Sequence, residues 1–388
     1  MVYTVRWGIL ATGWIAEKFA GDLLKDPSTR NTRDVAHVVA AVASSSGKDR
    51  AERFCRDLGI SEACAIYGSY RELVNDTNVD IVYVASPHSH HFQHTMLALE
   101  GGKHVVCEKP LTVNAAQAKI LYKTARENNL FLLDAVWTRF FPLSIQIRES
   151  IQKGEIGEVL RVIADTSFGI HPDIALKETP RKLTYELAGG ALLEIGIYSL
   201  TWVFQTLYHT LPRDQRKRPS SILSYMNKYE PTGVDQTTTL LISFPTSTPS
   251  NLPNSSSHGV AMTAFAVATD PDQKNSAGPA IRIQGTRGEI QVYGPAFQPT
   301  RYKVIPAKKG DLATTIRDVE LPFPANGHGM FYEADEAARC IRDGKLESET
   351  MPWDESILVM EVMDEVRKQG ELKYPDSIES DVVQHSNK

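Results

Sequence analysis

Cysteine is scarce in this chain of 388 residues, which has only Cys55, Cys64, Cys107 and Cys340. The four residues form no Cys-x-x-Cys pair and show no spacing typical of zinc ligands. A disulfide framework is therefore excluded, and we expect no metal site. We interpret the four residues as reduced thiols, which favours a protein of the cytosol.

A surplus of positive charge is also missing. The chain has 42 lysines and arginines against 47 aspartates and glutamates, and its net charge is −5. A protein that binds the phosphates of a nucleic acid or an anionic membrane surface needs the opposite balance. We therefore expect neither nucleic acid nor membrane among its partners.

Long apolar runs are rare as well. Residues 1–7 lack the apolar stretch of a signal peptide. Residues 188–208 are mostly apolar, but they contain Glu194, Gln205 and several glycines, which do not suit a membrane span. We predict a buried helix in this stretch.

The length predicts two or three domains, at roughly 150 residues each. Over residues 1–138 strand-like and helix-like segments alternate, which is typical of a parallel sheet in an α/β domain. The expected strands are residues 2–10, 36–44, 65–67, 80–85, 104–107 and 130–134. The expected helices are residues 15–24, 48–58, 70–75, 91–100 and 115–128.

Residues 139–388 follow a different pattern, because strand-like segments succeed one another without helices between them. This predicts an α+β domain with a mostly antiparallel sheet. The expected strands are residues 159–168, 221–229, 236–244, 260–269, 280–285, 289–293 and 300–305. Two closing helices, residues 331–343 and 354–369, can pack back on the first domain, while residues 213–218 and 245–258 are predicted surface loops.

A glycine-containing turn follows the first expected strand. In a strand, turn and helix of this kind, amides at the helix N-terminus bind the pyrophosphate of a dinucleotide. Ala11 stands where the usual motif has its first glycine, so an ordinary tight turn is the alternative. The place in front of a complete βαβ unit favours a cofactor site. Its expected contacts are Gly8, Ala11, Thr12, Gly13, Trp14 and Ile15.

The second strand ends before Ser44, Ser45 and Ser46, which Arg50 follows. An NAD site places a carboxylate here for the ribose 2′-hydroxyl, whereas hydroxyls and an arginine suit a 2′-phosphate. We therefore predict NADP as the cofactor. The alternative is that Arg50 belongs to the solvated face of a helix.

Two further loops follow the carboxyl ends of strands, where open α/β sheets bind their ligands. The residues in them that we expect beside the cofactor are Ser86, Pro87, His88, His91, Glu108 and Lys109. Lys109 can place its charge near the nicotinamide ribose and a substrate hydroxyl. A lysine in a surface turn is the alternative.

Glu194 and Tyr198 lie in the apolar stretch described above. Because they are four residues apart, they share one face of a helix. A carboxylate and a phenol on an otherwise apolar helix predict a cleft into which both point. The alternatives are a core tyrosine and a glutamate bonded to a backbone amide.

Six motifs together carry a resemblance to a known family. They are WGILATG at 7–13, VYVASPHSHH at 82–91, CEKP at 107–110, AVWTRFFP at 135–142, LAGGA at 187–191 and GHGMF at 327–331. On these motifs the chain resembles the Gfo/Idh/MocA oxidoreductases. Within them it is most similar to the branch of NADP-dependent D-xylose 1-dehydrogenase and dimeric dihydrodiol dehydrogenase.

The resemblance implies a Rossmann domain followed by an open-faced antiparallel sheet, and it implies a homodimer. Lys109 and Tyr198 would form the catalytic pair, and Glu194, where the family usually has aspartate, would orient the substrate or this pair. The expected substrate contacts are Lys109, Trp137, Phe168, Glu194 and Tyr198. Trp137 and Arg139 are expected beside the cofactor, with a packing role between domains as the alternative.

Three functions follow from the residues and the resemblance. The first is NADP-dependent oxidation of an aldose, D-xylose above all, at C1 to the aldonolactone, with Tyr198 accepting the proton. The second is oxidation of trans-dihydrodiols on the same scaffold. The third is a catalytically silent NADP-binding regulator, against which the retention of Lys109 and Tyr198 argues.

Overall fold

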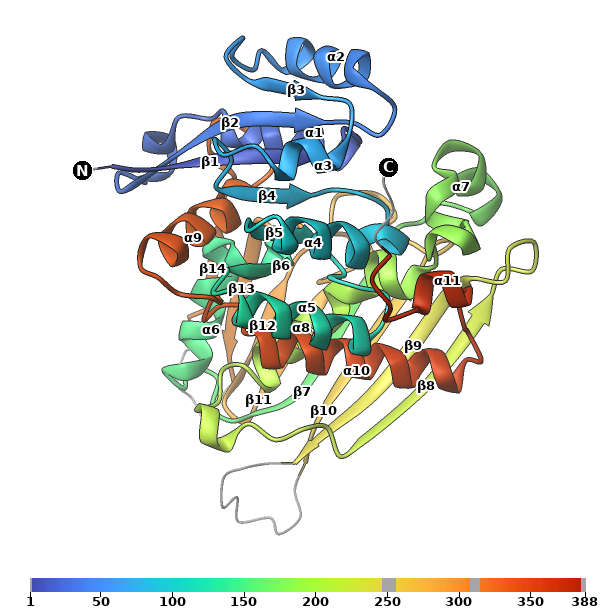
Figure 1. The fold of residues 1–388 in the computed structure, drawn as a ribbon. Coiled ribbons are helices and arrows are strands. Elements are labelled where there is room, and N and C mark those ends of the chain that lie inside the picture. Colours follow the sequence, from blue (N-terminus) through green and yellow to red (C-terminus); the bar gives the residue numbers. More distant parts are fainter. Residues whose placement is uncertain (1, 246–255, 308–314, 385–388) are drawn as a thin grey trace. The chain divides into compact units, whose positions relative to one another are not determined.

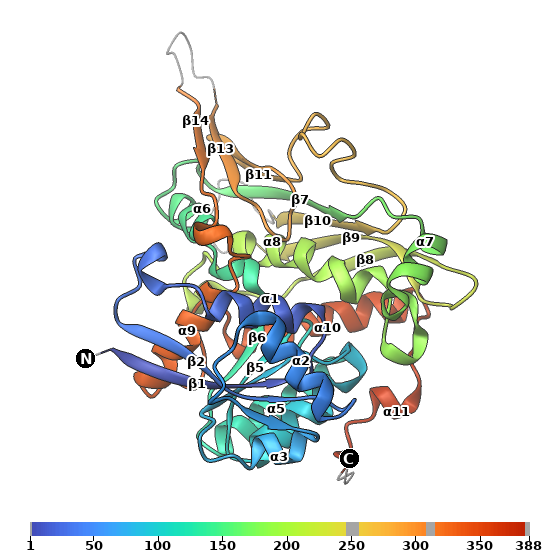
Figure 2. The same cartoon turned by 90° about the horizontal axis from the view of Figure 1, so that it is seen from above.

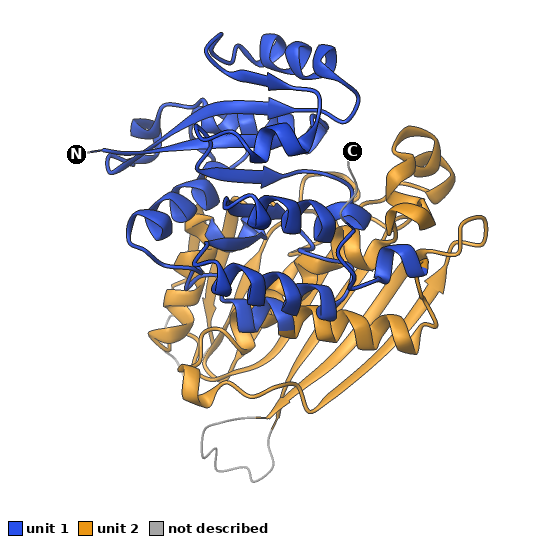
Figure 3. Ribbon diagram, viewed as in Figure 1, with its two compact units in different colours: residues 1–140, 323–357, 376–388 blue, residues 141–322, 358–375 orange. Residues whose placement is uncertain are grey.

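The computed structural model describes residues 2–245, 256–307 and 315–384. The chain forms two compact units, which Figure 3 colours separately. Unit 1 comprises residues 1–140, 323–357 and 376–388, and unit 2 comprises residues 141–322 and 358–375. The closing part of the chain therefore contributes to both units.

Unit 1 is built on a six-stranded parallel sheet in the order β3-β2-β1-β4-β5-β6 (Figure 1). Its strands are β1 (Tyr3–Leu10), β2 (Val35–Ala43), β3 (Ala65–Tyr67), β4 (Ile81–Val84), β5 (His104–Glu108) and β6 (Leu132–Ala135). Every residue of β4 is buried, as expected for a central strand with both faces covered. The order is that of a Rossmann fold, which confirms the predicted fold class and all six predicted strands.

The helices between these strands also confirm the prediction. They are α1 (Trp14–Leu23), α2 (Lys48–Leu58), α3 (Tyr70–Val74), α4 (His91–Glu100) and α5 (Ala115–Glu127). Local sequence explains their ends, since Ser69 and Glu72 form a capping box for α3 and the Asn114 side chain caps α5. Short 3-10 turns lie at η1 (Pro27–Arg30), η2 (His88–His90) and η3 (Trp137–Phe140).

Helix α9 (Phe331–Arg342) comes late in the chain but packs on α1, β1 and β2, beside which Figure 2 shows it. The carboxylate of Asp22, on α1, accepts hydrogen bonds from the amides of His328 and Met330 just before α9. Helices α10 (Trp353–Gln369) and α11 (Asp376–Glu379) follow. Helix α9 thus completes the first unit, whereas most of α10 belongs to unit 2.

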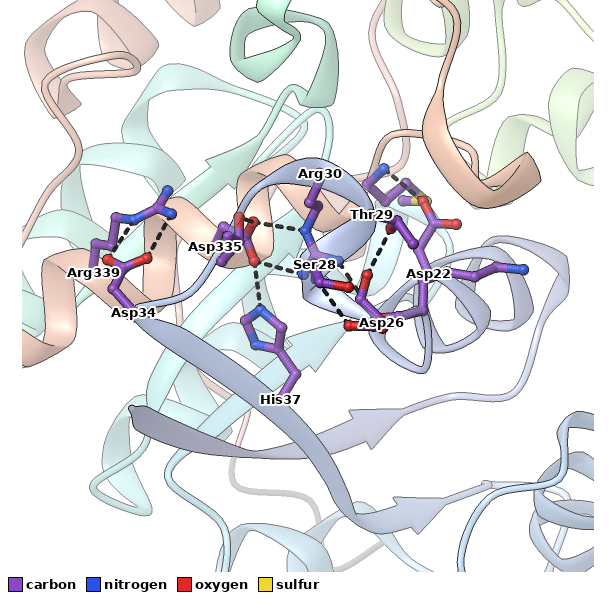
Figure 4. A network of polar contacts seen from close by, with 12 residues as sticks. Asp22, Asp26, Ser28, Thr29, Arg30, Asp34, His37, Asp335 and Arg339 are labelled. Carbon is purple, nitrogen blue, oxygen red and sulfur yellow. Dashed lines mark hydrogen bonds and ion pairs between the residues drawn. The ribbon is translucent and has the colours of Figure 1, made fainter. Parts of the chain in front are cut away.

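A buried polar network fastens α9 to the first strands (Figure 4). Asp335 of α9 accepts hydrogen bonds of 2.8 Å from Arg30, Thr32 and His37. Trp7 donates to Nδ1 of His37, so the imidazole proton lies on Nε2 and points at Asp335. Burial alone raises the pKa of the Asp335 carboxyl, but the bonds from Arg30 and His37 lower that pKa to about 2. Asp335 is therefore a charged, fully paired group in the core.

Unit 2 contains an eight-stranded sheet in the order β14-β13-β12-β11-β7-β10-β9-β8. Its strands are β7 (Val159–Ser167), β8 (Ser221–Lys228), β9 (Asp235–Pro245), β10 (Ser256–Ala264), β11 (Ile281–Gly285), β12 (Gly288–Val292), β13 (Arg301–Pro306) and β14 (Arg317–Glu320). Strands β7 and β10 pair in parallel, and the other neighbours pair antiparallel. The predicted mostly antiparallel sheet is confirmed.

Helix α8 (Ile197–Leu207) packs on β7 and β10, and all of its residues are buried. Gly259 of β10 permits this close approach, because an added Cβ would lie 2.4 Å from Cγ1 of Val203. The segment Tyr185–Leu207 is long and apolar enough to cross a membrane, yet 94% of its most apolar window is buried. This confirms the predicted core helix. Two more helices of unit 2 are α6 (Pro142–Gln152) and α7 (Pro172–Glu178).

Several expectations about unit 2 were wrong in detail. The strand expected at residues 260–269 begins at Ser256 and ends at Ala264, because this range pairs with β9 from Pro245 to Thr237. The predicted loop 245–258 therefore includes strand residues at both ends, and residues 246–255 lie outside the described part. Helix α7 and strand β14 were not predicted, since β14 is short and mostly exposed and has no apolar alternation.

We expect Asp335→Ala to lower the free energy of unfolding by about 3 to 5 kcal/mol, because it leaves the Arg30 charge buried without its partner. Urea titration followed by circular dichroism measures the loss. The matched control is Asp34→Ala, which removes a carboxylate that pairs with Arg339 and Arg342 at the surface. That change should cost about 1 kcal/mol or less. Equal losses in the two variants would contradict the central role of Asp335.

Candidate active site

The turn between β1 and α1 has the backbone of a dinucleotide-binding loop. Ala11 has φ 78°, a left-handed conformation that glycine usually occupies, and its amide donates to the Ala43 carbonyl. Gly13 is the N-cap of α1 and supplies no side-chain cap, and an added Cβ there meets no atom within 4 Å. The departure at residue 11 thus changes the side chain but keeps the turn, and the N-terminus of α1 stays open to an anion.

Three further residues of this motif occupy different surroundings. Gly8 lies inside β1, where an added Cβ would lie 2.8 Å from Cδ2 of Leu73. Its surroundings indicate a packing role against α3 instead of the expected cofactor contact. Trp14, the first residue of α1, is 64% exposed, and Ile15 is half-buried.

The structure brings the predicted 2′-phosphate residues to the same turn. The Thr12 hydroxyl donates to the buried Ser44 hydroxyl over 3.3 Å, and the Arg50 guanidinium donates to the Thr12 carbonyl over 2.9 Å. Ser45 and Ser46 are exposed beside Ser44. Hydroxyls and a cation therefore stand at the end of β2, in the place where NAD-specific sites have a carboxylate.

His91 connects the loops that follow β4 and β5. Its ring nitrogens lie 2.8 Å from the carbonyl oxygens of Ser86 and Pro110, and the side chain has no exposed surface. His91 therefore holds the two loops together through their backbone carbonyls, whereas the sequence predicted a contact with the cofactor. The hydroxyl of Ser86 is buried and has no hydrogen-bond partner among the described residues. Such an orphaned donor fits a bound polar ligand.

The Glu-Lys-Pro segment follows β5 directly. The Glu108 carboxylate is buried and accepts a 2.5 Å hydrogen bond from the Tyr83 hydroxyl of β4. Lys109, one residue later, is half-buried at the carboxyl edge of the sheet. The loop after β4, with Pro87 and the buried His88, reaches the same edge. These positions fit the general rule for ligand sites in open α/β sheets.

Arg139 and Trp137 lie in η3 and are almost completely buried. The Arg139 guanidinium donates to Glu355 over 2.5 Å and to the Thr350 carbonyl. This ion pair joins η3 to the start of α10, so the packing alternative describes Arg139 better than the expected cofactor contact. The signal that sequence reasoning lacked was the partner, which lies more than 200 residues later in the chain.

In unit 2 the apolar stretch begins with a π-helical segment, Leu192–Gly196, which leads into α8. Buried Asp235 fixes its start, because it accepts hydrogen bonds from the Leu192 amide and the Thr238 hydroxyl. Gly190 has φ 126°, and an added Cβ would lie 2.1 Å from Oδ1 of Asp235. Wide helical turns of this kind often occur at functional sites. The regular α-helix expected across Glu194 and Tyr198 was therefore wrong for its first turn.

The Glu194 carboxylate is held by an arginine that the sequence analysis missed. Nη1 and Nη2 of Arg181 each lie 3.1 Å from one carboxylate oxygen. Only 6% of the Glu194 side chain is exposed, against 44% of the Arg181 side chain. The structure thus supplies a charged partner for Glu194, which neither of the alternatives considered above included.

Tyr198 belongs to a row of three aromatic rings in contact. Its ring lies 5.8 Å from that of Phe297, which contacts Phe168 edge to face at the same distance. Nζ of Lys182 lies 4.8 Å from the centre of the Phe168 ring. Unit 2 therefore places the expected Phe168 and Tyr198 on one aromatic wall, and it adds Phe297 and Lys182, for which the sequence pattern gave no signal.

We expect Asp235 to make stability pH-dependent. Burial raises the pKa of its carboxyl to about 6, above the value of the unfolded chain. The stabilising neutral form is complete below about pH 4, and its contribution is lost as the pH rises through about 6. Asp235→Asn should therefore gain stability relative to the unchanged protein between pH 4 and 7. Thermal melts at several pH values measure the difference, and a difference that does not vary with pH would contradict the assignment.

Two family models match successive parts of the chain. Residues 5–134 match the model of an oxidoreductase family with an NAD-binding Rossmann fold, and residues 144–291 match the GFO/IDH/MocA C-terminal domain. Together the two matches cover most of the sequence.

Individual proteins match over almost the whole length. The chain is 50% identical to a D-xylose 1-dehydrogenase (NADP+) of Hypocrea jecorina, over 98% of this chain and 95% of that protein. It is 34% identical to a trans-1,2-dihydrobenzene-1,2-diol dehydrogenase of Macaca fuscata fuscata, over 96% and 98% of the two chains. A 3-ketoreductase from Actinomadura kijaniata, solved with NADP and TDP-benzene, shares the fold with a TM-score of 0.70 at 20% identity, over 95% of this chain and 98% of that chain.

Proposed function

The chain belongs to the GFO/IDH/MocA oxidoreductase family, and we propose that it oxidises D-xylose at C1 to the lactone with NADP as acceptor. The observation that carries this proposal is the 50% identity over 98% of the chain to a D-xylose 1-dehydrogenase (NADP+). The hydroxyls and the guanidinium at the end of β2 support the choice of NADP.

We propose that the turn at Ala11 and the open N-terminus of α1 hold the pyrophosphate of the cofactor. Ser44 and Arg50 hold its 2′-phosphate, because hydroxyls and a fixed guanidinium are suitable donors for that dianion. Ser86, in the loop after β4, donates a hydrogen bond to the cofactor from its buried hydroxyl, which has no other partner among the described residues. Bound NADP supplies the acceptor for the hydride that leaves C1.

We propose that Tyr198 accepts the proton of the C1 hydroxyl as the C1–H bond breaks. The ionised phenol is the form that can take this proton, and we propose that the cation of Lys109 stabilises that form. The ring of Tyr198 is fixed against Phe297, so its hydroxyl has few orientations. The Glu194 carboxylate accepts a hydrogen bond from another hydroxyl of the sugar, and this bond orients the sugar.

Oxidation of trans-dihydrodiols is the second candidate, because relatives with that activity in their name are 34% identical. The aromatic wall of Phe168 and Phe297 suits an apolar ring as well as the C–H face of a sugar. A silent regulator is a weaker candidate, since it needs neither Lys109 nor Tyr198.

Initial rates of NADPH formation with D-xylose, D-glucose and trans-1,2-dihydrobenzene-1,2-diol test this proposal. We expect turnover of D-xylose with NADP, and much slower turnover when NAD replaces NADP. Tyr198→Phe keeps the ring packing but removes the proton acceptor, and it should lower kcat by about 100-fold or more.

The matched control is Tyr293→Phe, which removes a hydroxyl bonded to Gln291 in another part of unit 2. This control should keep full activity. Faster turnover of the dihydrodiol would favour the second candidate. Tight NADPH binding without turnover of any of the three compounds would favour a regulator.

We also propose that the protein is a cytosolic homodimer joined through the outer sheet face of unit 2. We define this face by Leu223 and Tyr225 of β8 and Leu241 of β9, which are 61%, 75% and 45% exposed. Leu223 and Leu241 are direct neighbours in the sheet register. Exposed apolar groups that adjoin in this way favour a protein partner, and a second copy supplies a matching face.

Leu223→Arg combined with Leu241→Arg should convert the dimer to a monomer, because it buries two unpaired charges in the interface. Light scattering after size-exclusion chromatography measures the mass. The matched control is Leu160→Arg, an exposed leucine of β7 that is not on the outer sheet face. A monomeric unchanged protein, or a dimer that persists in the double variant, would contradict the interface.

A further inference from the structure

Arg181 and Glu194 form an ion pair whose two members differ in burial. Nη1 and Nη2 of Arg181 each bond one oxygen of Glu194 at 3.1 Å, so the contact is bidentate. The carboxylate end is 6% exposed and the guanidinium end 44% exposed. A carboxylate with so little contact with water is costly unless a cation stays beside it.

The backbone holds both members of the pair in one place. Arg181 lies in the short turn η4 (Pro180–Leu183), and the Lys182 carbonyl accepts a 2.8 Å bond from the Gly190 amide. The Gly190 carbonyl in turn accepts from the amide of Glu194. A Cβ on Gly189 would lie 2.7 Å from the Lys182 carbonyl oxygen, so a larger residue there would force η4 away. Backbone hydrogen bonds and close packing therefore join η4 to the π-helical segment.

The same short turn also contacts the aromatic wall. Lys182, next to Arg181, lies over the ring of Phe168, and this ring leads through Phe297 to Tyr198. The turn η4 thus joins the carboxylate of Glu194 to the wall that carries the proposed proton acceptor. No motif in the sequence marks this turn.

We propose that Arg181 is a positioning residue for the sugar. It keeps Glu194 ionised and fixes the direction of its carboxylate. Glu194 then accepts a hydrogen bond from a substrate hydroxyl, and it does not serve as the base that removes the proton. A carboxylate whose two oxygens face a planar guanidinium keeps its outer lone pairs in one plane, which defines where a hydroxyl can donate. This inference rests on the proposed sugar oxidation and adds Arg181 to it.

The test compares Arg181→Gln, Arg181→Lys and the control Lys177→Gln in the full-length protein, with D-xylose and NADP as substrates. Lys177 is an exposed lysine of α7, so its replacement makes a similar loss of charge nearby. We expect Arg181→Gln to lower kcat/KM for D-xylose by at least about tenfold while KM for NADP stays constant. Arg181→Lys should recover part of this loss, because lysine restores the charge but not the bidentate contact. Lys177→Gln should have no effect.

A pH profile separates this role from a merely structural one. Without Arg181 the buried Glu194 binds a proton more readily, so the acid limb of kcat/KM for D-xylose should move to higher pH in Arg181→Gln. Melting curves check that the variant is folded. An unchanged acid limb and unchanged kcat/KM would overturn the role of Arg181, as would a loss that follows only a lower melting temperature. Lack of D-xylose turnover in the unchanged protein would instead refute the proposed function, and this inference with it.

Discussion

The buried carboxylate of Asp335 is the interaction on which the first unit depends. It joins a helix near the end of the chain to η1 and β2, which lie about 300 residues earlier. Arg30 beside it has no exposed side-chain surface, so neither charge has water as a substitute partner. A buried ion pair of this kind adds little to the free energy of unfolding when it is complete, but the loss of one partner lowers that free energy strongly. Positions of α9 that separate the pair are therefore strongly disfavoured. Asp22 also helps to fix the position of α9, because it accepts hydrogen bonds from the amides of His328 and Met330 at the N-terminus of that helix.

A comparable constraint shapes the second unit around Glu194. Gly189 and Gly190 give the backbone the room in which Asp235 and the Lys182 carbonyl approach. The Asp235 carboxylate accepts a hydrogen bond from the Leu192 amide, and the turn that begins there is a π-helix. The direction of the Glu194 side chain is therefore determined by the packing of these neighbouring residues and not by the repeat of a regular helix.

The sequence predicted those features that local patterns determine. Apolar runs at regular intervals identified the six strands of unit 1, and the serines before Arg50 identified a site without a ribose carboxylate. The sequence did not predict the partners of Arg139, His91 and Arg181, which are Glu355, two backbone carbonyls and Glu194. A side chain's role depends on the partner that tertiary packing brings to it, and no periodicity in one sequence reports such a partner. Ala11 shows the reverse case, since the residue departs from the motif while its φ of 78° preserves the turn.

The composition of the unit 2 wall bears on which substrates the proposed site accepts. An aromatic wall alone accepts any flat apolar ring, and the hydroxyl of Tyr198 alone accepts any alcohol. The ion pair of Arg181 and Glu194 adds a condition, because a ligand that displaces water from a carboxylate must return hydrogen bonds to it. A sugar has further hydroxyls for this purpose, whereas an arene dihydrodiol has only the two at the reacting edge. A site built to bond a hydroxyl rejects analogues that lack it far more strongly than an apolar pocket rejects an extra one. We therefore expect the proposed site, because it includes this ion pair, to favour polyhydroxylated substrates, and replacing the ion pair with apolar residues should shift that preference towards aromatic diols.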